Sequence, residues 1–335
     1  MFNKITLGTG LMGWAMVFAN ITHAADPGAA QVFKFKFATD KPLVYAVKVA
    51  NRQMNDTTIG TRNSLTRNTV ETRYKFKLTR VAGANTNGTM SVYFHPFDFE
   101  QDIDNVTQQG HGVVTIRGLN IVFKQDDIVV VDTGRDIGFT QAKNFKQTAY
   151  PYLLSGYLDF DATGRIKTLG GDPPFIDTWT ENLKSLVGLF HITFPTNAIA
   201  VQDTWTNIMI LKSSGGTVFN GDGISRPFVF EREPDSPAAG GGSTEPVVCF
   251  KCYESCNVTD IGGYFEQFGQ RTSIAIPESS ESAEATFHFD PKLGCVTDVK
   301  ITGKSQSTTK AMVQNSSNTA HMNMDSEISI TLVTP

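Results

Sequence analysis

The chain has 335 residues, of which 40% are hydrophobic, and its 24 phenylalanines supply ample material for a buried core. Its formal net charge is −4 at pH 7, and the basic residues form no dense cluster. Such a composition argues against binding to nucleic acid or to an anionic membrane surface.

The first 24 residues have the pattern of a secretory signal peptide. Lys4 supplies a positive charge, residues 5–21 form an uncharged and largely apolar stretch, and Ala24 offers a small residue for cleavage. The stretch is too short and too polar to favour a transmembrane anchor. We therefore expect an exported protein, periplasmic or extracellular, with no transmembrane segment after signal cleavage.

Residues 25–172 are predicted to form a first β-sheet half. Apolar residues alternate here with polar or charged ones, which is typical of antiparallel strands with one buried face. The runs that show the alternation are 33–37, 43–49, 73–78, 90–94, 113–117, 119–123 and 128–131. The aromatic residues on the apolar side of this pattern are Phe33, Phe35, Phe37, Tyr74 and Phe76.

Two features of this half are candidate catalytic or metal sites. Asp132-Thr133-Gly134 follows an apolar run, as in aspartic peptidases, but that chemistry needs two carboxylates and the chain has no second such motif. The alternating acidic residues Asp98, Glu100, Asp102 and Asp104 could gather calcium, although a solvated edge strand is the commoner reason for such a series. We predict a turn at Asp132, no catalytic residue, no metal site and no cofactor.

A single helix is predicted between the two halves. Apolar residues step by three and four positions from Ile176 to Phe190, after Pro173-Pro174 and before Pro195, which indicates an amphipathic helix within residues 173–194. Two interpretations remain open: the helix covers a sheet face, or it only connects the halves.

Residues 195–335 are predicted to form a second, similar β-sheet half. The strand-like runs are 204–211, 247–253, 272–276, 285–289, 296–301 and 327–333, and Phe287 and Phe289 lie on the apolar side of theirs. The passage 287–296 resembles 158–166, since each reads as strand, Asp-led turn, Gly and strand. The polar segment 234–246 predicts a flexible surface loop. The expected fold is therefore mainly β, with two antiparallel sheets or half-barrels joined by one helix.

All four cysteines, Cys249, Cys252, Cys256 and Cys295, lie in this second half. An even number of cysteines in an exported chain favours two disulfides, with three pairings open. A zinc or iron–sulfur site is the alternative, which an oxidising compartment opposes.

The passage from Phe194 to Trp205 resembles the Pro…Val…Gly-Asp-Thr/Ser-Trp turn of a large uncharacterised family, a domain of unknown function found in exported β-rich bacterial proteins. This chain departs from the family at Gln202, where the family prefers Gly, and by its cysteines. The resemblance implies architecture and an envelope location rather than chemistry.

These observations favour a non-enzymatic exported protein of the cell envelope or secretome. The aromatic residues of both halves, Phe33, Phe35, Phe37, Tyr74, Phe76, Phe287 and Phe289, are a candidate face for an apolar ligand or lipid if they line a groove instead of a solid core. The alternatives are a structural or protein-interaction component of the envelope and, third, a hydrolase acting through Asp132 or the acidic series.

Overall fold

The computed structural model describes residues 30–36, 41–59, 61–81, 89–108, 110–135, 137–138, 155–171, 192–211, 213–214, 217–220, 224–237, 246–267, 270–313 and 316–334. Within these ranges the regular structure is β, apart from the short 3-10 turn η2 (Thr133–Arg135). The prediction of a mainly β, antiparallel protein is therefore confirmed. In the part of the chain that the structure describes, no helix is long and apolar enough to cross a membrane.

Long strands dominate the sheet. The seven longest are β1 (Leu43–Ile59), β2 (Arg62–Arg80), β3 (Thr89–Thr107), β14 (Pro246–Gln267), β15 (Gln270–Asp290), β16 (Cys295–Val313) and β17 (Ser316–Thr334). The shorter strands are β4 (Gly110–Arg117), β5 (Asn120–Gln125), β6 (Ile128–Asp132), β7 (Gly156–Asp161), β8 (Ile166–Gly171), β9 (Thr204–Leu211), β10 (Ser213–Ser214), β11 (Thr217–Phe219), β12 (Ile224–Arg232) and β13 (Ser236–Pro237).

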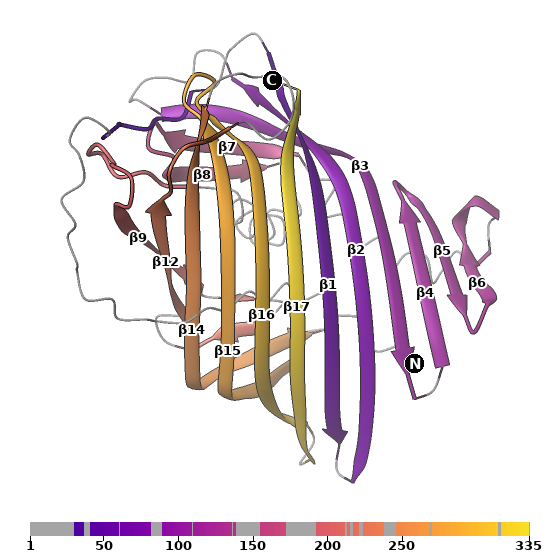
Figure 1. Cartoon of the computed structure of the whole chain (residues 1–335). Coiled ribbons are helices and arrows are strands. Elements are labelled where there is room, and N and C mark those ends of the chain that lie inside the picture. Colours follow the sequence, from indigo (N-terminus) through magenta and orange to yellow (C-terminus); the bar gives the residue numbers. More distant parts are fainter. Residues whose placement is uncertain are drawn as a thin grey trace.

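One antiparallel sheet runs through the described residues and curves strongly (Figure 1). Its backbone pairing runs β9–β12–β14–β15–β16–β17–β1–β2–β3. Strand β3 then pairs with β7 along its first part and with β4 along its last part. Because the last strand, β17, pairs with the first, β1, over most of its length, the two ends of the chain belong to the same sheet.

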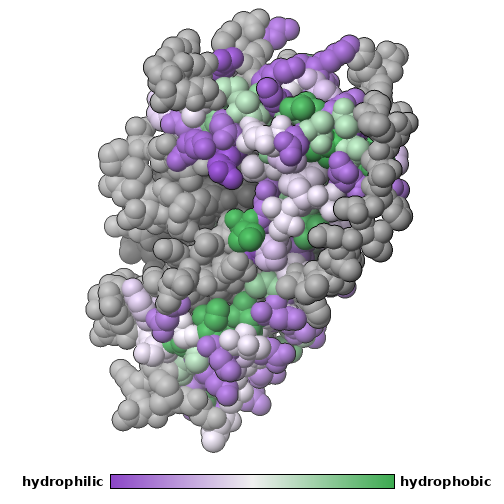
Figure 2. All heavy atoms as spheres, turned by 90° about the vertical axis from the view of Figure 1, so that its left-hand side faces the viewer, coloured by the Kyte–Doolittle hydropathy of each residue, from purple (hydrophilic) through white to green (hydrophobic). Residues whose placement is uncertain are grey.

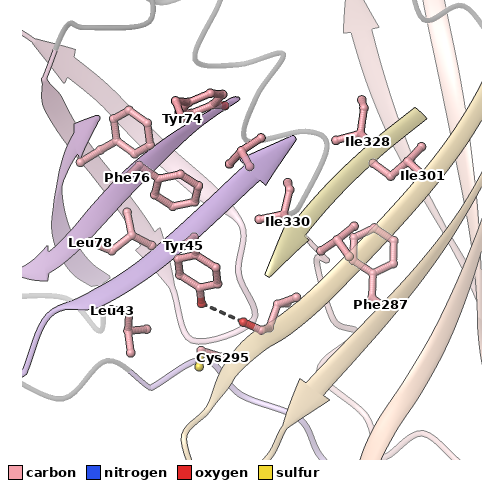
Figure 3. Packing of buried hydrophobic residues seen from close by; sticks show 14 of the residues in the cluster. Leu43, Tyr45, Tyr74, Phe76, Leu78, Phe287, Cys295, Ile301, Ile328 and Ile330 are labelled. Atoms are coloured by element: carbon pink, nitrogen blue, oxygen red, sulfur yellow. Dashed lines mark hydrogen bonds between the residues drawn. The ribbon is translucent and has the colours of Figure 1, made fainter. Parts of the chain in front are cut away.

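Alternate residues of the long strands form a buried inner face and an outer face that carries the charges. On β1 and β2, for example, Tyr45 lies opposite Phe76 and Val47 lies opposite Tyr74, and all four side chains are buried. Figure 3 shows these residues packing toward Ile328 and Ile330 of β17 and Ile301 of β16. The Tyr45 hydroxyl donates a hydrogen bond to the Val296 carbonyl, 2.8 Å away, so the polar end of this buried side chain is satisfied.

The two similar passages noted in the sequence are both hairpin turns, and both contact the segment 33–36. The backbone N–H of Phe35 donates to the Ala162 carbonyl in the β7–β8 turn, and that of Lys36 donates to the Gly294 carbonyl in the β15–β16 turn. A Cβ on Gly294, whose φ is +64°, would lie 2.5 Å from the Lys36 Cβ, so this close approach requires glycine. The segment 30–36 therefore ties together two hairpins that are far apart in the sequence.

Three parts of the predicted fold differ from the structure or lie outside it. The division into two halves is not seen, because strands of both parts form one sheet. The predicted helix 176–190, the signal peptide 1–24, Phe37 and most of the loop 234–246 lie outside the described residues, although Ser236–Pro237 of that loop forms β13 against β14. Residues 33–36, predicted as a strand, have no regular strand pairing.

Candidate functional site: the inner face of the curved sheet

The predicted apolar-binding residues lie in one buried cluster. Phe33, Phe35, Tyr74, Phe76, Phe287 and Phe289 are each at most 6% exposed and belong to the same core. Phe289 brings two of them together, since its ring centroid lies 6.0 Å from that of Phe33 and 5.5 Å from that of Phe35. These rings are in contact with one another, so the aromatic residues form a packed core at the end of the sheet where the 30–36 segment lies.

The inner face changes character about halfway along the long strands. Beyond the aromatic core, its side chains become small or polar, for example Ala283, Gly303, Ser305 and Ser326. Ala283 lies opposite Gly303, and Gly303 lies opposite Ser326, so the small residues form a row across three neighbouring strands. A row of small side chains leaves the sheet wall thin at this level, whereas aromatic side chains fill the space above it.

Apolar residues return further along the same strands. Cys256, Val258 and Ile276 form a second, smaller cluster, against which Ile261 and Ile274 pack. On the side of the molecule shown in Figure 2, apolar residues reach the surface in both the upper and the lower half, between polar ones. Along the long strands, the inner face therefore has three successive zones: the aromatic core, the row of small and polar residues, and a second apolar zone.

Ionisable residues lie buried in the small and polar row. Arg226 of β12 and Glu254 of β14 form an ion pair whose side chains are each 7% exposed. Glu281 of β15 is 2% exposed, and burial raises its pKa to about 9, with Arg226 opposing and Glu254 adding to the increase. Burial also raises the pKa of Glu254, against the effect of Arg226. At neutral pH the cluster is therefore one ion pair beside one uncharged carboxylic acid.

Several polar atoms of this cluster have no hydrogen-bond partner among the described residues. They include the Arg226 Nε, the Glu281 Oε1 and the Ser305 Oγ. Glu281 lies directly opposite Ser305 on β16 and opposite Cys256 on β14, so two of these atoms belong to neighbouring side chains on the same face. Buried polar atoms without partners are rare in folded proteins and each needs a physical explanation.

Amide side chains continue the polar row along the same inner face, on strands β2 and β3. The Gln101 side-chain amide donates to the Thr72 hydroxyl at 3.0 Å, and that of Asn105 donates to the Asn68 side-chain carbonyl. Asn68, Thr72 and Gln101 are all at least 93% buried. These hydrogen bonds offset part of the cost of burying the amides, although the Gln101 Oε1, like the Glu281 Oε1, has no partner among the described residues.

The sequence analysis missed Arg226, Glu254 and Glu281. They lie on three strands and are separated by up to 55 positions, so no local motif joins them. One signal was present: Glu254 lies two positions from both Cys252 and Cys256, which places it on their buried face if the segment is a strand.

The predicted disulfides are not present. None of the four cysteines, all of which the structure describes, forms a disulfide. Cys249, Cys252 and Cys256 lie along the single extended strand β14, where residues three or four apart are about 10 Å or more apart. Cys295 begins β16, which is separated from β14 by β15, and two strand spacings again amount to about 10 Å. A disulfide needs Cα atoms within about 7 Å, so the extended geometry excludes these pairings.

Cys249 instead belongs to a line of side chains on the outer face. It lies opposite His288, which lies opposite Asp298, and the His288 Nδ1 is 3.5 Å from the Asp298 Oδ2. The neighbouring Asp298 carboxylate, followed by Cys249, raises the pKa of His288 to about 9. The three strands that carry these residues pair on both sides, so ladder hydrogen bonds use the backbone N–H groups that acyl transfer would need as oxyanion donors. This line can hold a protonated histidine, but it lacks the parts of an acyl-transfer site.

The other candidates from the sequence are held in local interactions. The Asp132 Oδ1 accepts from the Gly134 N–H at 3.0 Å and its Oδ2 lies 3.3 Å from the Arg135 Nε, which confirms the predicted turn. The acidic series of β3 faces basic side chains of the neighbouring strands: Lys75 contacts Asp98, Arg117 contacts Asp102, and His111 contacts Asp104. In the described ranges, no group of three or more acidic, histidine or cysteine side chains is placed to hold a metal ion.

No family model matches this chain, and no curated protein matches it. Among solved structures, one similar chain is from a study of lipid–protein interactions in lipovitellin, with 10% identity, a TM-score of 0.46, and coverage of 89% of this chain and 26% of that one. The chain thus spans about a quarter of that lipovitellin chain. A second is the translocator domain of the autotransporter NalP from Neisseria meningitidis, with 6% identity, a TM-score of 0.17, and coverage of 84% of this chain and 87% of that one. A third is the P. putida toluene transporter TodX, with 7% identity, a TM-score of 0.15, and coverage of 88% of this chain and 90% of that one. Likenesses at this level carry no functional argument.

Proposed function

We propose that this protein is a non-enzymatic carrier that holds an amphipathic ligand, with an apolar chain and a polar head, against the inner face of its curved sheet. The observation that carries the proposal is the mid-strand change of the inner face from aromatic to small and polar residues, followed by a second apolar zone. An apolar chain matches the zone of Val258 and Ile276, and a polar head matches the row that contains Glu281.

An exported location is part of the same proposal. It is supported by the signal-peptide pattern of residues 1–24 and by the resemblance of residues 194–205 to the uncharacterised exported family. Amino-terminal sequencing of the protein taken from its own cells tests it. Cleavage after Ala24 is expected, and an intact amino terminus in the mature protein contradicts export.

Native mass spectrometry tests the carrier function. The protein, purified from its own host without detergent, is expected to carry a bound amphiphile that organic solvent releases. Gly303→Val adds a branched side chain to the thin row of the inner face and is expected to reduce the bound fraction, whereas Thr302→Val changes the neighbouring, outward-facing residue and serves as the matched control. Absence of any bound amphiphile in wild type, or equal loss in both variants, contradicts the proposal.

A further inference from the structure

The cluster of Arg226, Glu254 and Glu281 is an unusual feature for a sheet wall. Burying ionisable groups is unfavourable unless each is paired and hydrogen-bonded. Arg226 and Glu254 neutralise each other, but Glu281 is 2% exposed and its Oε1 has no hydrogen-bond partner in the described structure. Leu or Met at position 281 would fill the same place without this cost, so stability alone does not explain the glutamate.

The cluster contains both hydrogen-bond donors and acceptors that have no partner among the described residues. The Arg226 Nε is a donor, and the Glu281 Oε1 and the Ser305 Oγ are further buried polar atoms without a hydrogen-bond partner among the described residues. Arg226 and Glu254 both act electrostatically on Glu281, and Ser305 lies opposite it on the next strand, so the groups surround one small region of the inner face. Only a molecule that itself both donates and accepts hydrogen bonds satisfies all of them.

The charge balance selects the kind of head group. With Glu254 paired to Arg226 and Glu281 protonated, the cluster has no net charge, so a charged head group would bring an uncompensated charge into a buried place. A carboxylate would compete with Glu254 for Arg226, and an ammonium group would lie beside the Arg226 cation. An uncharged hydroxyl- or ester-bearing group does neither.

We infer that Arg226, Glu281 and Ser305 form the head-group site of the carrier and that this site takes an uncharged, hydroxyl-bearing head of the monoacylglycerol class. The inference rests on the proposed carrier function and names the ligand class for it. Glu281 donates its carboxylic proton and accepts through its second oxygen, Arg226 donates through Nε, and Ser305 does either.

Equilibrium binding of three amphiphiles tests this site. All three have an alkyl chain of about twelve carbons, so that only the head group differs. The probes are a monoacylglycerol, the corresponding fatty acid and the corresponding alkylamine, each measured by displacement of a fluorescent alkyl probe from the full mature protein at pH 7. The monoacylglycerol is expected to bind about tenfold more tightly than either charged probe, the equivalent of one or two hydrogen bonds.

Substitutions at Glu281 separate the head-group role from a packing role. Glu281→Leu is expected to remove the preference for the monoacylglycerol, and Glu281→Gln, which keeps an uncharged donor and acceptor, is expected to retain it. Glu284→Gln, on the outer face of the same strand, is the matched control and is expected to change nothing. If Glu281→Leu fails to fold, the comparison of wild type with Glu281→Gln above pH 9 replaces it. There the wild type loses its preference as Glu281 ionises beside Arg226, Glu254, Cys256 and Ser305, and the glutamine variant keeps it.

Equal affinity for the three probes, or an unchanged preference in Glu281→Leu, overturns the head-group site and leaves the carrier function standing. A water-filled polar row would give this result. Failure of the protein to bind any of the three probes contradicts the carrier function itself, and the head-group site with it.

Discussion

Gln202 has a backbone conformation that is unfavourable for a residue with a side chain. It has a φ of +71°, in the left-handed region, within the turn that leads into β9. The turn is tied to β12 because the Gln202 N–H donates to the Arg232 carbonyl at 2.8 Å, and Asp203 accepts from the Ala200 N–H at 2.7 Å. Glycine adopts this left-handed conformation without steric cost, so the backbone at position 202 favours glycine over glutamine.

Gln202→Gly is therefore expected to stabilise the protein. Relief of the left-handed conformation outweighs the added freedom of the unfolded chain, and the free energy of unfolding should rise by about 0.5–1 kcal/mol. Gln306→Gly, in the middle of strand β16, is the control and is expected to lower the free energy of unfolding. Urea titration measures both, and a destabilising effect of Gln202→Gly would contradict the interpretation of the turn.

The His288–Asp298 pair predicts a pH dependence of stability. The pKa of His288 is raised from 6.5 to about 9 in the folded protein, so the folded state binds the proton more tightly than the unfolded state does. The pair therefore contributes its full stability below about pH 6.5 and loses it as the pH rises through 9. Asp298→Asn removes the main cause of the shift.

Chemical unfolding at several pH values compares this variant with wild type. Wild type is expected to exceed Asp298→Asn in stability at pH 6, and the difference should shrink steadily toward pH 9.5. A difference that stays constant over this range would show that His288 does not depend on Asp298.

At the scale of elements, Arg232 joins three parts of the chain. It is 2% exposed, its Nη1 donates to the Ile199 carbonyl at 2.6 Å, and its guanidinium lies 5.2 Å from the centre of the Phe33 ring. Strand β12, the turn before β9 and the segment 30–36 thus meet at one cation, which satisfies a carbonyl and stacks on an aromatic face.

Arg232→Ala is expected to cost about 3–5 kcal/mol, because it removes one of the two donors to the Ile199 carbonyl and the ion-pair partner of Asp235, and it leaves a large cavity beside Phe33. Arg52→Ala, at an exposed position of β1, should change stability by less than about 0.5 kcal/mol. Limited proteolysis of Arg232→Ala should also cut first near residues 30–36. Equal stability of the two variants would show that Arg232 does not hold these elements together.

The sequence predicted the parts of the long strands that line the aromatic core better than the parts beyond it. The run 43–49 lies in β1, 247–253 in β14 and 296–301 in β16, but these strands continue to Ile59, Gln267 and Val313. The second halves of β1 and β16 carry polar residues on both faces, so the period of two disappears there, and in β14 it is interrupted at Asp260, which has a φ of +55°. Backbone pairing with neighbouring long strands extends them, which is a property of the sheet and not of the local sequence.

The candidate site was less predictable than the strands. Six of the seven predicted aromatic residues are described, and all six lie in the buried core; alternation along a strand accounts for the four that lie in β2 and β15. Arg226, Glu254 and Glu281 come together only through the register of β12, β14 and β15, and register depends on pairing over long distances in the chain. The compartment and the number of cysteines predicted disulfides, but three of the cysteines lie along β14 and Cys295 lies two strands away on β16, which keeps their Cα atoms too far apart.

At the scale of the whole molecule, the pairing of β1 with β17 makes one curved wall from both ends of the chain. The aromatic core, together with the segment 30–36, holds one end of this wall, and its long strands continue well beyond that core. A wall that extends past its own core, with a polar row and a second apolar zone on its inner face, is suited to hold a ligand with one polar and one apolar part.

Photo-crosslinking locates the ligand on this wall and tests the central claim most directly. A monoacylglycerol that carries a diazirine at the end of its chain is bound to the full mature protein, irradiated and mapped by peptide mass spectrometry. Adducts are expected on inner-face residues of the long strands, such as Val258, Ile276 and Met322, and they should disappear when unlabelled ligand competes. Adducts confined to outward-facing residues such as Ile208 and Tyr253, or labelling that competitor does not reduce, would contradict the account.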